Sequence, residues 1–160
     1  MDRVNKILEH PLYKSKFNKI QELEKTREFC NHTMEHFIDV ARIAYIINLE
    51  ECLGLKKDII YAAALLHDIG RADEYENGIS HSKAGSIIAN SILSSINEFE
   101  ENEINDIISA IKEHRSMCEH TTNLGMLIYK SDKLSRCCFN CKSNEKCNWS
   151  EDKKNNYLKV

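Results

Sequence analysis

The chain has 160 residues, of which 42% are hydrophobic and 29% are charged, and this composition is typical of one globular domain. Its five glycines and single proline supply few residues for tight turns, which argues against an all-β fold. The formal charge is −3, from 22 basic and 25 acidic residues, so the overall charge gives no reason to expect binding of long nucleic acid.

Helical periodicity runs through the first half of the chain. Residues 12–29 place spaced apolar side chains among many Lys and Glu residues, which predicts an amphipathic helix behind Pro11. In residues 33–53 apolar side chains recur at i, i+3, i+4 and i+7, and the glycine that follows should end this helix. Residues 57–68 are almost entirely apolar, so we expect this helix to be the most buried element.

The second half predicts three further helices after an exposed loop. Residues 71–80 are rich in Asp, Glu and Asn, which favours a loop, and Ser80 is a suitable N-cap for the next helix. Because no repeat or domain boundary is found, we expect residues 1–160 to form one compact, all-α helical bundle with its core at about residues 30–136. The remaining elements are helices at 81–96, 101–115 and 124–136, a loop at 116–123 and a polar, cysteine-bearing tail at 137–160.

Sequence signals for the cellular compartment agree with one another. No apolar run reaches the roughly 18 residues of a membrane span, and no basic-then-apolar leader precedes the first helix. The seven cysteines are an odd number, which argues against a secreted disulfide framework. We therefore expect a cytoplasmic protein with reduced thiols and no membrane contact, and the sequence is also compatible with a homodimer.

The pair His67-Asp68 is the most informative feature of the chain. It follows the apolar run Ala62-Ala63-Ala64-Leu65-Leu66, so both side chains should lie in the core. Burying an ionised carboxylate costs several kcal/mol unless it is paired or bound to a metal. A divalent cation bound by both side chains would offset that cost. The pair therefore predicts a metal site.

Other ligand-type residues lie on helix faces that should point to the core. His36 shares the apolar face of its helix, and His81, His114 and Asp132 occupy similar inward positions. A lone core-facing histidine is more often a structural residue than a ligand. Several of them together with the His-Asp pair would be costly unless a shared ion neutralised them. We therefore expect five helices to direct six nitrogen and oxygen ligands towards one point.

The order of these residues resembles the HD-domain superfamily of metal-dependent phosphohydrolases. The family pattern is a first histidine, a His-Asp pair and a distant aspartate on helices of an all-α bundle, and here it matches His36, His67-Asp68 and Asp132. His81 resembles one of the two further histidines found in dinuclear branches. The resemblance covers about residues 30–136.

His114 resembles the other additional histidine of the dinuclear branches. It lies 18 positions before Asp132, a spacing similar to that of the branch that cleaves dinucleoside tetraphosphates symmetrically. The resemblance implies that Asp68 bridges two ions, with His81 and His114 on the second ion. It also implies that the first ion is bound by His36, His67, Asp68 and Asp132.

The implied activity is metal-dependent hydrolysis of a phosphoester or phosphoanhydride in a small phosphorylated compound, with a nucleotide as the expected substrate. A nitrogen and oxygen ligand set favours one or two ions of Fe, Mn, Co, Ni or Mg, and Zn is also compatible. Such an ion lowers the pKa of bound water from about 15.7 towards about 7. His67 and Asp68 would therefore be catalytic as well as metal-binding.

Phosphate binding requires cationic side chains as well as metal. Arg71, directly after the pair and its glycine, is the first choice, and Lys133 is the next because it neighbours Asp132; both are also candidate catalytic residues. Lys83 and Arg115 are further candidates, although each of the four could instead be a solvated surface charge. His32 and His120 lie near expected ligands and could relay a proton, but a surface role is the stronger expectation for both.

The tail contains a second group of potential metal ligands. Cys138 and Cys141 form a Cys-x-x-Cys step, and Cys147 follows six residues later. Three or four thiolates this close could hold Zn²⁺ or an iron–sulfur cluster, with Cys137 or a remote cysteine as an additional ligand. Simple packing of the tail over the bundle is the alternative, because a second paired spacing is missing.

Two other functions are compatible with the sequence. The bundle could be a non-catalytic sensor whose His/Asp cluster binds a metal or ligand and signals to a partner. It could also be a di-iron oxygenase, because related bundles use the same ligand types for oxidative chemistry. The full ligand set favours catalysis over sensing.

Overall fold

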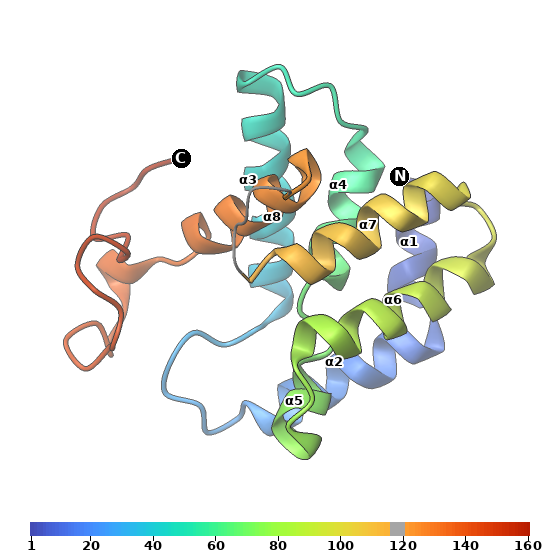
Figure 1. Cartoon of the computed structure of the whole chain (residues 1–160). Helices are drawn as coiled ribbons and strands as arrows, with labels where there is room; N and C mark the ends of the chain where they lie inside the picture. Colours follow the sequence, from blue (N-terminus) through green and yellow to red (C-terminus); the bar gives the residue numbers. More distant parts are fainter. Residues whose placement is uncertain (116–120) are drawn as a thin grey trace.

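A computed structural model describes residues 1–115 and 121–160 of the chain (Figure 1). All of the regular elements in these residues are helices, which confirms the all-α class. The elements are α1 (Asp2–Glu9), α2 (Pro11–Leu23), α3 (Met34–Glu50), α4 (Lys57–Leu66), α5 (Arg71–Asn77), α6 (His81–Ile96), α7 (Glu101–Glu113), α8 (Asn123–Leu134) and the short 3₁₀ helix η1 (Cys138–Asn140).

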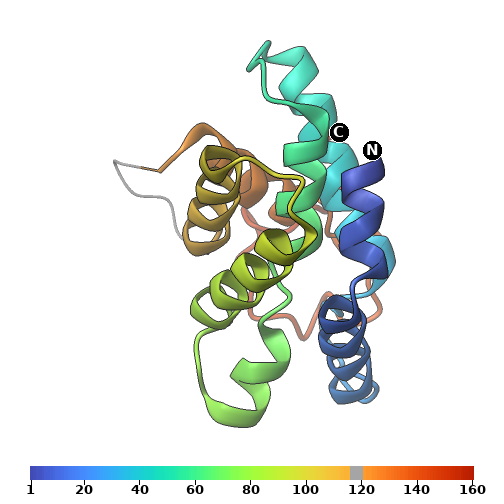
Figure 2. The same cartoon turned by 90° about the vertical axis from the view of Figure 1, so that its right-hand side faces the viewer.

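Helix α4 is the centre of the bundle, as its apolar sequence predicts. It packs against α1, α3, α7 and α8. Ala62, Ala63 and Ala64 are fully buried, and their small side chains allow neighbouring helices to approach closely. Figure 2 shows α1 and α2 on one side of the α3–α4 pair and α6 and α7 on the other. The His-Asp pair that follows α4 is therefore delivered to the middle of the molecule.

Two expectations from the sequence are wrong. Residues 71–80 do not form a loop, because Arg71–Asn77 is helix α5. Asp73 and Glu74 lie in its first turn, where acidic side chains stabilise a helix, and Gly78 ends it in the left-handed conformation at φ 68°. The predicted helix 12–29 is also shorter, since α2 ends at Leu23. The chain beyond Leu23 instead turns inward towards the buried site.

Helix α1 was not expected from the sequence. Arg3 connects this helix to the rest of the bundle. The Arg3 guanidinium donates to Asp58 at the start of α4 over 2.6 Å and forms a further ion pair with the buried Glu103 of α7. It also lies 4.5 Å from the centre of the Phe99 ring. The first helix of the chain is thereby joined to two others that surround the site.

Gly70 permits a close approach between the end of α4 and helix α6. A Cβ atom at this position would overlap the backbone oxygen of His81 and the backbone nitrogen of Gly85. Both obstacles are backbone atoms, which cannot rotate away. Glycine at position 70 therefore sets the distance between the His-Asp pair and the helix that carries His81.

The tail after α8 contains little regular structure but is attached to the bundle by polar contacts. The Asn155 side chain donates to the backbone oxygens of Lys133, Leu134 and Arg136 over 2.7, 3.3 and 2.9 Å. Lys146 pairs with Glu28, so the tail lies beside the α2–α3 connection (Figure 1). None of the described helices combines the length and apolar character needed to cross a membrane.

Replacing Arg3 should weaken the attachment of α1. We expect Arg3→Ala to lower the free energy of unfolding by about 2 kcal/mol, because two partly buried, charge-assisted hydrogen-bond partners lose their donor. Lys6→Ala on the same helix removes only an exposed pair with Glu98 and should change it by less than about 0.5 kcal/mol. Urea denaturation measures both values, and equal values for the two variants would contradict this role of Arg3.

A methyl group at position 70 should force α4 and α6 apart. We expect Gly70→Ala to lower the free energy of unfolding by about 3 kcal/mol, since the overlapping atoms belong to the backbone. The control is Gly54→Ala, where φ is 72° but nothing lies within 4 Å, so only about 1 kcal/mol of backbone strain is expected. Thermal unfolding in which the two variants lose equal stability would argue against the close approach.

Candidate metal centre

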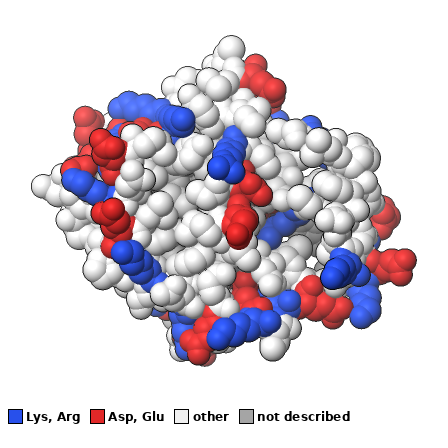
Figure 3. Space-filling model, turned by 180° about the vertical axis from the view of Figure 1, so that it is seen from behind, with Lys and Arg blue, Asp and Glu red and all other residues white. Residues whose placement is uncertain are grey.

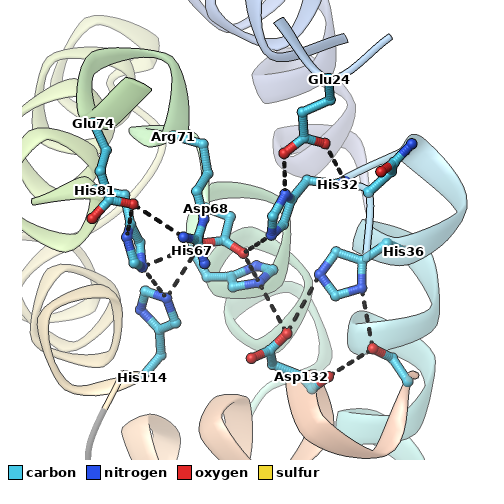
Figure 4. Close-up of polar contacts among 12 residues, drawn as sticks. Glu24, His32, His36, His67, Asp68, Arg71, Glu74, His81, His114 and Asp132 are labelled. Carbon is cyan, nitrogen blue, oxygen red and sulfur yellow. Dashed lines mark hydrogen bonds and ion pairs between the residues drawn. The ribbon is translucent and has the colours of Figure 1, made fainter. Parts of the chain in front are cut away.

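The carboxylate of Asp68 lies at the centre of the site, fully buried just beyond α4 (Figure 4). Its Oδ1 atom is 3.4 Å from His81 Nε2 and 3.5 Å from His114 Nε2. Its Oδ2 atom is 3.1 Å from His67 Nε2. One oxygen therefore faces the α6–α7 side of the bundle, and the other faces the side that His67 occupies.

The first group of potential ligands comprises His36, His67, Asp68 and Asp132, whose ligand atoms lie within 4.8 Å of one another. His36 comes from α3 and Asp132 from α8, and their Nε2 and Oδ1 atoms are 3.5 Å apart. His67 Nε2 is 3.9 Å from the same Asp132 oxygen. Three helices thus bring two imidazoles and two carboxylates to one point.

The second group comprises Asp68, His81 and His114, and its ligand atoms also lie within 4.8 Å of one another. His81 begins α6 and His114 follows α7, with 3.2 Å between their Nε2 atoms. Asp68 belongs to both groups. This is the arrangement in which one carboxylate can bridge two cations, and the six expected ligands all lie in it.

The histidine rings are held so that Nε2 points to the carboxylates (Figure 4). A backbone oxygen can only accept, so a ring that bonds one through Nδ1 must donate there, which leaves Nε2 with a free lone pair. Metal-binding histidines are usually oriented in this way. The Nδ1 contacts are His67 with Ala64 O at 2.6 Å, His114 with Ile111 O at 2.6 Å, His81 with Glu74 Oε2 at 2.8 Å and His36 with Ser135 Oγ at 3.1 Å.

Two buried polar atoms in the cluster lack a hydrogen-bond partner among the described residues. They are His67 Nε2 and Asp68 Oδ2, and both residues are fully buried. An unsatisfied buried polar atom costs roughly 1–3 kcal/mol, and more when it is charged. A divalent cation between these atoms would satisfy both, so the residues present fit a metal ion.

The electrostatics of the cluster also suit a cation. Burial alone would raise the pKa of the Asp68 carboxyl, but His67 and Arg71 hold it well below its usual range. Burial lowers the pKa of His81 to about 4, against the opposing effect of Asp68. Near neutral pH the carboxylate is therefore ionised and the His81 imidazole neutral, which are the forms that bind metal.

His32 lies inside the site, and the expectation of a surface role for it is wrong. The side chain is buried, with Nε2 3.3 Å from Asp68 Oδ2. Glu24 holds the residue twice, through His32 Nδ1 at 2.5 Å and the His32 backbone N–H at 2.6 Å. The sequence placed Glu24 on a continuous helix, and the early end of α2 is what turns its carboxylate inward. His120 lies outside the described residues.

Two arginines contact the ligand groups from opposite sides. Arg71, which was expected, donates through Nε to Asp68 Oδ1 over 2.8 Å. Arg136, which sequence reasoning missed, places Nη2 3.2 Å from both Asp132 Oδ1 and His36 Nε2. Its position four residues after Asp132, one helical turn away, was the signal that could have identified it.

The other three expected cations lie further from the ligand groups. Lys133 forms an ion pair with the outer oxygen of Asp132. Arg115 is exposed, and in the described parts of the chain it forms an ion pair with Glu74 at 3.5 Å. Lys83 is also exposed, and no ion pair involves it within the described parts of the chain. Phosphate binding by these residues stays a prediction, with Lys133 the best placed of the three.

A cavity of about 200 Å³ opens beside the ligand groups. His32, Arg71, Asp132 and Arg136 line it from the bundle, and Trp149 lines it from the tail. Seen from behind, basic and acidic side chains are interspersed over the surface, and basic atoms lie inside a recess (Figure 3). The cavity therefore leaves room for a small molecule beside the ligand groups.

Comparisons with known proteins identify a family whose pattern covers the ligand residues. The family model described as HD domain matches residues 33–137. An uncharacterized protein of Clostridium beijerinckii is 46% identical over 97% of both chains. Ribonuclease Y of Acetivibrio thermocellus is 29% identical over 79% of this chain, which spans only 22% of that protein. The crystal structure of a predicted HD superfamily hydrolase from an uncultured Thermotogales bacterium has a TM-score of 0.64 and 24% identity, covering 88% of this chain and 79% of that one.

Removing the shared carboxylate should empty both ligand groups. We expect Asp68→Asn to lose the bound divalent metal that elemental analysis detects in the wild-type protein after loading with Mn²⁺ and desalting. His114→Ala should lose only part of the metal, because the group with His36 stays intact. The control is Asp106→Asn, which changes an exposed carboxylate on α7. Wild-type metal content in the Asp68 variant would contradict the bridging role.

Proposed function

Because the chain belongs to the HD-domain family, we propose that it is a phosphohydrolase that cleaves a phosphoester or phosphoanhydride of a small compound, with a nucleotide as its substrate. HD-domain proteins are, in general, metal-dependent phosphohydrolases. The observation that carries the proposal is the pair of ligand groups that share Asp68 next to a cavity lined with arginines.

Each ligand group would hold one divalent ion. His36, His67, Asp68 and Asp132 would bind the first, and His81 and His114 would join Asp68 at the second. The nitrogen and oxygen donors favour Fe, Mn, Co, Ni or Mg, while Zn remains compatible. When bound, such ions lower the pKa of a water molecule and polarise a phosphoryl oxygen.

The chain's own cations would bind and orient the phosphate. The guanidinium groups of Arg71 and Arg136 are planar donors suited to paired phosphate oxygens, and both line the cavity. Lys133, which pairs with Asp132, lines the same cavity and adds a third positive charge in contact with the ligand groups. Three cations converging on a metal-type cluster support phosphate chemistry more strongly than the oxygenase alternative, which does not require them.

His32 is a candidate for proton transfer in the proposed reaction. Its Nε2 atom is 3.3 Å from Asp68 Oδ2 and the residue lines the cavity, while Glu24 fixes its Nδ1. Although burial opposes ionisation, the contact with His32 keeps the pKa of Glu24 below its ordinary value. Because Glu24 contacts Nδ1, Nε2 is the ring nitrogen that can accept a proton during the reaction and release it afterwards.

A short RNA is a second candidate substrate. A groove of about 600 Å³ adjoins the site. It shares Lys133 and Trp149 with the cavity of about 200 Å³ beside the ligand groups, which we call the catalytic cavity. Arg115, Lys130, Lys153 and Lys159 line it, with Tyr129 as a second aromatic residue. Basic side chains with aromatic rings are typical of single-stranded nucleic-acid sites. A net charge of −3 does not prevent such a local groove, and the ribonuclease Y similarity is consistent with it.

A substrate screen tests the function. The purified protein is assayed with Mn²⁺, Fe²⁺, Co²⁺ and Ni²⁺ against mononucleotides, dinucleoside polyphosphates and end-labelled short RNA. We expect metal-dependent release of phosphate or nucleotide that stops after chelation. Cleavage of RNA alone would favour the second candidate, and turnover that resists complete metal removal would contradict both.

Arg136 should contribute directly to phosphate binding. We expect Arg136→Ala to lower kcat/KM by about 10- to 100-fold, because a charge-assisted hydrogen bond contributes roughly 1.5–3 kcal/mol. Arg42→Ala, which removes an exposed arginine from α3, is the matched control and should leave kcat/KM unchanged. If both variants retained wild-type kinetics, Arg136 would have no role in the substrate complex.

A further inference from the structure

Four cysteines from two distant parts of the chain line one small cavity. Cys30 lies in the α2–α3 connection, and Cys138, Cys141 and Cys147 lie in the tail. The cavity has a volume of about 90 Å³, and none of these thiols is in a disulfide. The sequence identified the three tail cysteines, and Cys30 is the remote fourth. We propose that these four thiolates form a second metal centre, separate from the His/Asp cluster.

The tail lacks the apolar core that would otherwise hold it in place. Its buried residues are Ser143, Lys154 and Asn155, all of them polar, whereas Phe139 and Leu158 are exposed and Trp149 is only partly buried. Segments that bury little apolar surface usually need a disulfide or a metal to keep a defined structure. A thiolate-bound metal would supply that link, since its binding free energy contributes directly to folding.

The backbone directs the four cysteines towards a common centre. Cys30 has φ 35°, a left-handed conformation that is unfavourable for a residue with a side chain. Cys138 and Cys141 lie on either side of a tight turn closed by a 3.1 Å bond from Cys141 N–H to Cys138 O. A Cys-x-x-Cys turn of this kind lets two sulfurs bind one metal centre, and a further turn leads to Cys147.

Two cations line the cysteine cavity and suit a thiolate centre. Lys154 is buried, with Nζ 3.0 Å from the backbone oxygen of Asn144, and Arg136, which follows α8, lines the same cavity. Four thiolates around a divalent ion or an iron–sulfur core carry a net negative charge, which Arg136 and Lys154 would offset.

The spacing of the sulfurs favours a centre larger than one ion. A single Zn²⁺ with bonds of about 2.3 Å would bring its sulfurs to roughly 3.8 Å from one another. Among the described residues, no three of these sulfurs lie mutually within 4.8 Å, unlike the ligand atoms of the His/Asp groups. An iron–sulfur cluster held by four cysteines requires wider spacing than a single ion, so we expect a cluster rather than one zinc ion.

The proposed centre would also shape one wall of the catalytic cavity. Cys30, Cys147 and Trp149 line that cavity as well as the cysteine cavity, and Arg136 separates the two. Loss of the centre would therefore displace the tail wall without removing any His/Asp ligand. This consequence rests on the proposed function, whereas the existence of the centre does not.

Thiol protection in the full-length protein tests the centre directly. The protein is purified without oxygen, alkylated in its native state and mapped by mass spectrometry, before and after metal removal. Cys141 is the sharpest probe because it is exposed, so only a bound ligand can protect it. We expect Cys141 to be protected until the metal is removed, whereas the exposed Cys52 and Cys137 react throughout. Equal reaction of all three before metal removal would overturn the proposal.

Metal analysis of cysteine variants identifies the centre. Acid-labile sulfide with iron would indicate a cluster, and neither sulfide nor thiolate-bound zinc can come from the His/Asp groups. We expect Cys141→Ser to lose this metal while retaining Mn²⁺ binding at the His/Asp cluster. The matched control is Cys137→Ser, which changes a neighbouring, exposed cysteine outside the proposed centre and should keep this metal. Zinc bound by cysteine sulfur would support a metal centre at these cysteines, but it would overturn the inference that the centre is an iron–sulfur cluster. Absence of both metals, even after reconstitution, would overturn the site.

Discussion

The structure depends on one buried negative charge. Asp68 is fully inaccessible, and its carboxylate lies among imidazole nitrogens at the end of the most apolar helix. A buried charge in that position must be offset by hydrogen-bond donors or positive charges around it. His67, His81 and His114 face it with nitrogen atoms, and Arg71 donates to it. The bundle can therefore be understood as a scaffold that brings helices α3, α4, α6, α7 and α8 to this carboxylate.

The same constraint explains features that lie further out. The histidine Nδ1 atoms are tied to backbone oxygens, a hydroxyl and a carboxylate, which leaves Nε2 free to face Asp68 or Asp132. Gly70 allows α6 to approach until His81 reaches the centre. Glu24 turns back from the end of α2 to hold His32 beside the same carboxylate. Packing, backbone geometry and hydrogen bonding thus serve one arrangement.

The sequence predicted most of this centre, and physical reasons account for what it missed. Helical periodicity places His36, His81, His114 and Asp132 on core-facing stripes, so their convergence could be expected before the fold was known. His32 and Glu24 lie where α2 ends, and no periodic pattern indicates that a chain will turn inward. Cys30 meets the tail cysteines across more than a hundred residues, and only the tertiary structure can bring such segments together. Helix α5 was missed because its acidic first turn and terminal glycine have the composition of a loop.

The central claim is that Asp68 bridges two cations held by the surrounding histidines and Asp132. Anomalous diffraction from crystals soaked in Mn²⁺ measures this most directly. We expect two peaks, one beside each Asp68 oxygen, with His36, His67 and Asp132 around one and His81 and His114 around the other. Crystals saturated with Mn²⁺ that show no peak at Asp68, or one bound only by surface carboxylates, would contradict it.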